Sequence, residues 1–98
     1  MKVLKLEGKS ISETDVANTL EALQTAVDGY IESVTLIPDK AVMIVNEEGR
    51  LRGMAPNPRA SAAANVPIVG PAIIAGVAGE EFTDVPADVE QCIKALFA

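Results

Sequence analysis

The feature that most constrains the fold is a run of twenty residues, Ala60 to Gly79 (ASAAANVPIVGPAIIAGVAG), that contains no ionisable side chain. Charged residues make up 22% of the whole chain, so this run has to lie against apolar neighbours, in its own core or at a partner. A membrane span needs about 20 continuous apolar residues, and prolines, glycines and polar side chains interrupt this run, which argues against a span. We therefore expect its second half to form the centre of a sheet.

Length and composition predict a single domain, residues 1–98, with an aliphatic core. A chain of 98 residues is long enough to bury roughly two-thirds of its unfolded surface. Apolar residues make up 49% of the chain and aromatic residues only 3%, so aliphatic side chains must fill the core. The single cysteine, Cys92, cannot form an internal disulfide, and the first residues alternate in polarity instead of forming an apolar leader. We therefore expect a cytoplasmic protein.

The charge distribution disfavours nucleic acid and anionic membrane surfaces as partners. The formal net charge is −6 and the pI is near 4.5, so the chain as a whole repels phosphate groups. The sign is uneven: residues 50–59 hold three arginines and no acid, whereas the last 19 residues hold five acids and one lysine. The arginine segment is the clearest electrostatic indication of a site.

The N-terminal part predicts a strand and then a helix. Residues 2–7 alternate in polarity, which is typical of a strand at an edge or half-exposed position. From Ser12 the apolar period becomes helical, and Ser12 with Asp15 has the spacing of a capping box, while Gly29 suits the end of a helix. The predicted helix covers about 13–28, with one apolar stripe formed by Val16, Leu20, Leu23 and Val27.

The middle of the chain predicts strands joined by tight turns. Residues 30–37 are rich in β-branched side chains and end at a proline-containing turn, and the apolar segment 41–46 follows as a strand covered on both faces. Asn46 to Gly49 then indicates a hairpin reversal with positive φ at Gly49, so we expect a brief returning strand over 51–54.

The C-terminal part predicts a short helix over 58–64, since Asn57 suits an N-cap and an alanine-rich segment follows. Two apolar pieces, 67–70 and 72–77, predict one or two strands, and 86–97 predicts a second amphipathic helix packed beside the first. These elements predict an α+β fold, a two-layer sandwich with a mostly antiparallel sheet of four or five strands packed by two helices.

The residue inventory argues against an enzyme. The chain has no histidine, which removes the usual general base near neutral pH, the commonest transition-metal ligand and every Ser-His or Cys-His pair. Cys92 falls on the apolar stripe of the last helix, where we expect a buried core residue and not a nucleophile. No phosphate loop, dinucleotide fingerprint or CxxC motif is present, so we expect no cofactor and no metal.

One group of residues indicates an anion site. Arg50 and Arg52 share a face if they lie on a strand, and Asn57 with Arg59 opens a helix whose free amides attract anions. The four residues are therefore candidates for binding a phosphate or carboxylate. The alternative is that these arginines only balance nearby acids, such as Glu47 and Glu48, on a solvated hairpin.

Five segments of the chain carry a resemblance to a known family, and they read DGYIE at 28–32, NEEG at 46–49, PNPR at 56–59, IVGPAIIAG at 68–76 and GEEFTDV at 79–85. The chain resembles small bacterial and bacteriophage proteins grouped as a domain of unknown function. It departs from their pattern where Pro58 separates Asn57 from Arg59 and where an alanine run replaces a polar loop. The resemblance implies a phage or mobile-element origin and an accessory role without assigned catalytic residues.

These observations predict a phage or mobile-element accessory protein that acts by binding, without catalysis. The apolar surplus at 60–78 suggests a homo-oligomer, and the resemblance suggests a host protein as a partner. The alternative is a small-ligand binder that captures an anionic nucleotide-type molecule near Arg50–Arg59.

Overall fold

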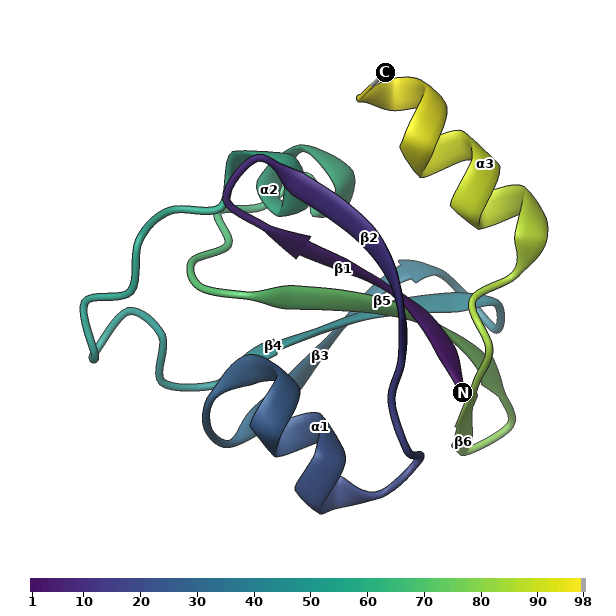
Figure 1. The fold of residues 1–98 in the computed structure, drawn as a ribbon, viewed down its shortest axis with the longest axis horizontal. Helices are drawn as coiled ribbons and strands as arrows, with labels where there is room; N and C mark the ends of the chain where they lie inside the picture. Colours follow the sequence, from purple (N-terminus) through teal and green to yellow (C-terminus); the bar gives the residue numbers. More distant parts are fainter. Residues whose placement is uncertain (98) are drawn as a thin grey trace.

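The computed structural model describes residues 1–97, which form a six-stranded antiparallel sheet and three helices (Figure 1). The strands are β1 (Lys2–Glu7), β2 (Ser10–Asp15), β3 (Ile31–Ile37), β4 (Ala41–Asn46), β5 (Ala72–Ala78) and β6 (Glu81–Thr83). The helices are α1 (Leu20–Val27), α2 (Pro58–Ala64) and α3 (Ala87–Leu96). The predicted α+β class, with an antiparallel sheet packed by helices, is confirmed.

The strand order β2-β1-β5-β4-β3 places β5 in the middle of the sheet, and β6 pairs with the end of β5 beyond β1. The second half of the charge-free run is therefore the central strand, as the sequence predicts. β4 lies between β5 and β3, which confirms that both its edges and faces are covered. Of the two positions predicted for β1, the edge is wrong, because β2 pairs with its outer side, whereas Lys2 and Lys5 are half-buried, in agreement with the other alternative.

Helices cover both faces of the sheet (Figure 1). α1 packs its buried residues Leu23 and Val27 on one face, which we call the α1 face. α2 and α3 pack on the opposite face, the α3 face, where the larger core lies. The last helix is thus confirmed at almost its predicted bounds, but it does not lie beside α1. Side chains alternate along β4 and β5, so each strand supplies apolar groups to both cores.

The predicted helix over 13–28 is wrong in its first half. Ser10–Asp15 forms β2, which returns along β1 after a two-residue turn in which Gly8 has φ 58°. Pairing with β1 along its whole length, from Lys2 with Asp15 to Glu7 with Ser10, outweighs the coincidental helical spacing at Val16. The helix begins only at Leu20, where Thr19 is the N-cap and its side chain accepts a hydrogen bond from Ala22 N at 3.2 Å.

The predicted hairpin after β4 does not form. Residues 47–53 make successive turns, in which Arg52 N donates to Glu48 O at 2.9 Å and Met54 N donates to Gly49 O at 2.9 Å. β3 and β5 already occupy both edges of β4, so a returning strand has no free edge to pair with. Positive φ occurs at Gly53 and not at Gly49.

The short helix α2 is confirmed at its predicted bounds, with Asn57 as N-cap and Asn65 in the left-handed conformation at its end. The piece 67–70 is not a strand and makes one isolated bridge, between Pro56 and Val69. Gly70 follows with φ 77°, and the chain then enters β5 directly after Pro71.

The buried side of α3 differs from the prediction at Cys92, which is exposed. Val89, Glu90 and Ile93 are the buried residues of this helix. Glu90 lies between two ammonium groups, 3.2 Å from Lys2 Nζ and 3.0 Å from Lys94 Nζ. These ion pairs give the carboxylate two opposite charges on the buried side of the helix. Within residues 1–97, no helix has the length and apolar character needed to cross a membrane.

Candidate ligand-binding cavity

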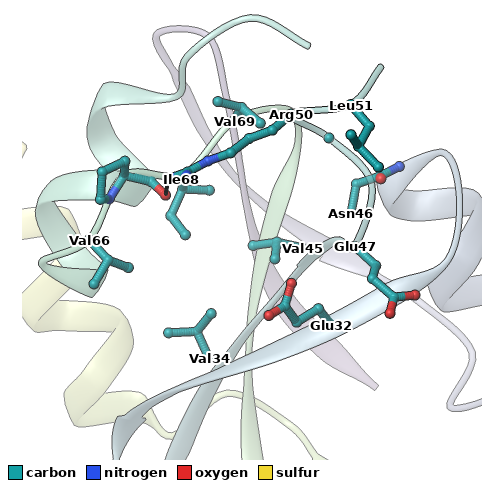
Figure 2. A pocket seen from close by; sticks show the side chains of 12 residues that line it. Glu32, Val34, Val45, Asn46, Glu47, Arg50, Leu51, Val66, Ile68 and Val69 are labelled. Carbon is teal, nitrogen blue, oxygen red and sulfur yellow. Dashed lines mark hydrogen bonds between the residues drawn. The ribbon is translucent and has the colours of Figure 1, made fainter. Parts of the chain in front are cut away.

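A cavity of about 370 Å³ opens on the α3 face, where the end of β4 and the start of β3 meet two loops (Figure 2). The strands supply its floor, and residues 47–51 and 66–69 supply its walls. The lining residues are Glu32, Val34, Val45, Asn46, Glu47, Gly49, Arg50, Leu51, Val66, Pro67, Ile68 and Val69. Six of these twelve residues have aliphatic side chains and three are charged.

Hydrogen bonds to α2 hold the wall at 66–69 in place. Ser61 Oγ accepts from Ile68 N at 2.8 Å and donates to Asn57 O at 2.8 Å. Asn57 N donates to Ile68 O at 2.9 Å, and Asn57 Nδ2 donates to Gly70 O at 2.8 Å. Asn57 and Ser61 thus hold the segment at Ile68 and at Gly70, just after its end, where it has almost no strand pairing of its own.

The second wall, at 47–51, is held by Asn46 at the end of β4. Asn46 is buried, and its Oδ1 accepts from Glu48 N at 2.8 Å while its Nδ2 donates to Val27 O at 3.0 Å. The two walls meet at Gly49, where an added Cβ would come within 2.8 Å of Val69 Cγ2. Glycine therefore allows the close approach that closes one end of the cavity.

Three charged side chains line the cavity, and none of them belongs to an ion pair within residues 1–97. Arg50 runs along the rim and its Nη2 lies 3.4 Å from Pro67 O, a long hydrogen bond that leaves most of its donors available. Glu32 directs its carboxylate toward the cavity from β3, and Glu47 lies at the rim with its carboxylate directed outward (Figure 2). Two carboxylates and one guanidinium give the lining a formal charge of −1.

The structure separates the four residues that the sequence suggests for an anion site. Arg50 lines the cavity, whereas Arg52 Nη2 lies 3.2 Å from Asp28 Oδ2, at the end of α1. Arg52 also lies in a turn, so it does not share a strand face with Arg50.

The other two residues serve the fold. Asn57 is buried and its side-chain amide bonds to the backbone at Leu6, Gly70 and Ala60. Arg59 lies over the ring of Phe97, 5.5 Å from its centroid, in a cation–π contact. Of the four, Arg50 is the residue that reaches the cavity.

Sequence reasoning missed Glu32. The signal was present, because Glu32 precedes Val34 and Leu36 at alternate positions on β3, and both valine and leucine pack on the core of the α3 face. A carboxylate on the same face of a strand as buried apolar side chains indicates a place where that face is open to solvent. Within residues 1–97, no three His, Cys, Asp or Glu side chains come together as a metal site.

A second hollow of about 380 Å³ lies on the other face, between β2 and α1, and includes Lys5 and Asp15. Its lining residue Val16 exchanges hydrogen bonds with Met1 at 2.8 and 2.9 Å, but, within residues 1–97, its lining contains no buried polar side chain comparable to Asn46. The cavity at Arg50 is therefore the better built site.

Fold and cavity together define an α+β domain with a central antiparallel sheet and an open cavity at one end of two of its strands. The chain belongs to the family described as Domain of unknown function (DUF3846), which matches residues 1–98. This match confirms the resemblance to a domain of unknown function, while the phage origin stays a prediction. No curated protein and no solved structure matches the chain significantly.

Proposed function

We propose that the protein acts by reversible binding, without catalysis, and that it takes a small molecule into the cavity between residues 47–51 and 66–69. The observation that carries this proposal is the presence of unpaired, opposite charges, Arg50 and Glu32, in one aliphatic cavity. Ligand sites of proteins typically have volumes of about 300 to 1,000 Å³ and combine an apolar lining with a few polar groups. The cavity of about 370 Å³ fits the lower end of that range.

The chemistry of the lining supports binding and not catalysis. It contains no serine, threonine, cysteine, lysine, tyrosine or histidine. Its two carboxylates, on Glu32 and Glu47, belong to exposed residues, and the lining places no nucleophile beside them. A role in orienting and retaining a molecule requires none of the missing groups.

The alternative ligand, an anionic nucleotide-type molecule, is less well supported. Its phosphates require several cations, but Arg52 and Arg59 contact Asp28 and Phe97 instead. The negative formal charge of the lining adds repulsion. A phage or mobile-element accessory role in the cytoplasm is the setting that we propose for the binding activity, on the basis of the resemblance and the composition.

A homo-oligomer or a host protein partner stays part of the proposal with weaker support. The sequence suggested an oligomer because of the apolar run, yet Ala60, Ile68 and 72–75 are buried within the chain. Leu51 and Val66, at the cavity rim, are exposed apolar side chains that a protein partner could contact.

A thermal-shift screen of small metabolites tests the binding function. The variant Val66→Trp fills the cavity mouth from a position that is 45% exposed, and Leu96→Trp is the matched control on α3, outside the lining. A ligand present at one hundred times its dissociation constant adds about 2.7 kcal/mol of stability, which raises the Tm of a domain of this size by about 10 °C or more. We expect stabilising compounds to act on the wild type and on Leu96→Trp but not on Val66→Trp. Compounds that stabilise all three proteins equally, or a screen without any stabilising compound, would refute the proposal.

A further inference from the structure

Two opposite charges lie on different sides of the cavity and do not meet. Arg50 extends along the rim toward Pro67, whereas Glu32 reaches in from β3, and the side chain of Val45 lies between them on the floor (Figure 2). Both charges are fixed at the backbone: Glu32 pairs with Val45 in the sheet, and Arg50 lies in the turn series after β4. The cavity therefore presents a separated pair of charges with fixed polarity.

The space between the charges is aliphatic. Val34, Val45, Val66 and Ile68 face it, and they offer neither donors nor acceptors. A molecule that enters displaces water from these side chains, and its own charged groups then meet Glu32 and Arg50 in surroundings of lower dielectric. Ion pairs formed in this way are stronger than those on an open surface. The best occupant is one whose charges are arranged in the opposite order to those of the cavity.

The volume limits the size of the occupant. About 370 Å³ is the share of roughly a dozen water molecules in the liquid. An amino acid or a dipeptide fits such a space.

We propose that the ligand is a small zwitterion, with an ammonium group held by Glu32, a carboxylate group held by Arg50 and an aliphatic segment against the valines. This inference rests on the proposed binding function and specifies its ligand class. A guanidinium binds a carboxylate through two parallel hydrogen bonds, which explains the use of arginine at this position. A dianion meets the carboxylate of Glu32, and a dication meets Arg50, so each places one charge against a like charge.

Binding measurements with three matched compound series test the ligand class. The series are straight-chain ω-amino acids of increasing length, and the diamines and dicarboxylates of the same lengths, observed by changes in the amide NMR spectrum at residues 45–51 and 66–69. We expect one or two lengths of the ω-amino acids to bind, and the corresponding diamine and dicarboxylate to bind about tenfold or more weakly. The best length gives the separation of the two charges.

Variants that remove one charge show which cavity residue binds the ammonium group of the ligand and which binds its carboxylate. Glu32→Gln should lower the affinity for the ω-amino acid about tenfold, so that the variant binds it little better than a simple carboxylate. Arg50→Gln should lower the same affinity, so that the variant binds the ω-amino acid little better than a simple amine. Glu80→Gln and Lys9→Gln are the matched controls at exposed turns outside the lining, and they should leave binding unchanged. Both cavity residues are exposed, so unchanged Tm values confirm that the variants fold.

The outcomes separate this inference from the binding function. Tighter binding of diamines or dicarboxylates than of ω-amino acids would overturn the ligand class, and so would equal effects of the control variants. In either case compounds that Val66→Trp blocks still support a binding cavity. If the screen with Val66→Trp also fails, the binding function itself is refuted.

Discussion

Replacing Asn57 by alanine is expected to destabilise the protein far more than the loss of a helix cap alone. The side chain accepts from Ala60 N at 3.1 Å and donates to Leu6 O at 2.9 Å and Gly70 O at 2.8 Å. It is only 2% exposed, so water cannot replace these bonds without rearrangement. One amide group thus connects α2, β1 and the segment that leads into β5.

The expected magnitude follows from these three bonds. Loss of an N-cap costs about 1 kcal/mol, and each buried partner left without its hydrogen bond costs about 1 to 3 kcal/mol. These terms sum to about 3 to 7 kcal/mol. Because the bond to Gly70 is only partly buried, Asn57→Ala should lower the free energy of unfolding by about 3 to 5 kcal/mol, in the lower part of that range and a large share of the total stability of a small domain. Urea unfolding followed by circular dichroism measures the change, provided that the m-value stays constant.

Two further variants separate the contributions. Thr19→Ala removes a cap from α1 at an exposed site without any bridging bonds, and it should cost about 1 kcal/mol. Asn57→Asp keeps the cap acceptor but faces the carbonyls of Leu6 and Gly70 with an acceptor, so it should destabilise at least as much as alanine. If Asn57→Ala costs no more than Thr19→Ala, the bridging role assigned to Asn57 is wrong.

Two other predictions concern the sheet and α3. Gly76→Ala should lower the free energy of unfolding by about 1 to 3 kcal/mol, because the new Cβ would lie 2.3 Å from Asp84 O. Urea unfolding measures the change, and an unchanged free energy of unfolding would contradict the close contact. Glu90 has a pKa lowered from 4.5 to about 2 by the hydrogen-bonding side chain of Glu13 and then by two lysine ammonium groups. A carboxyl whose pKa is lower in the folded state than in the unfolded state stabilises the fold at pH values above the unfolded pKa. The difference in free energy of unfolding between wild type and Glu90→Gln should therefore shrink as the pH falls from 4.5 toward 2. A difference in urea midpoint that does not change over this range would contradict the ion-pair role.

Local sequence patterns were sufficient to predict those elements in which every residue favours the same secondary structure. The apolar segments at β4 and β5 have too few charges to lie anywhere but inside the sheet, and Asn57 before the alanines defines α2. The hairpin of β1 and β2 was missed because its second strand is polar, so that alternation is weak and the helical spacing after it dominates. β2 is an edge strand that pairs only with β1 and is largely exposed, so it carries few apolar side chains.

The site was less predictable because it depends on contacts between distant segments. Arg50 could be selected from its charge and its position after β4, but its separation from Arg52 results from turns that no local pattern specified. Glu32 and Arg50 line the same cavity only because β3 pairs with β4 and because the segment after α2 folds over the end of both strands. These are long-range arrangements, which a single sequence does not encode as a motif.

The mouth of the cavity and the wall behind it depend on different residues. Leu51 and Val66 are 88% and 45% exposed, and they shape the cavity mouth without holding the core together. Asn57 and Ser61 hold the wall behind them through buried and partly buried hydrogen bonds. Exchange of these two surface side chains should therefore reshape the entrance of the cavity with little effect on the free energy of unfolding, while the hydrogen-bonded wall behind them stays in place.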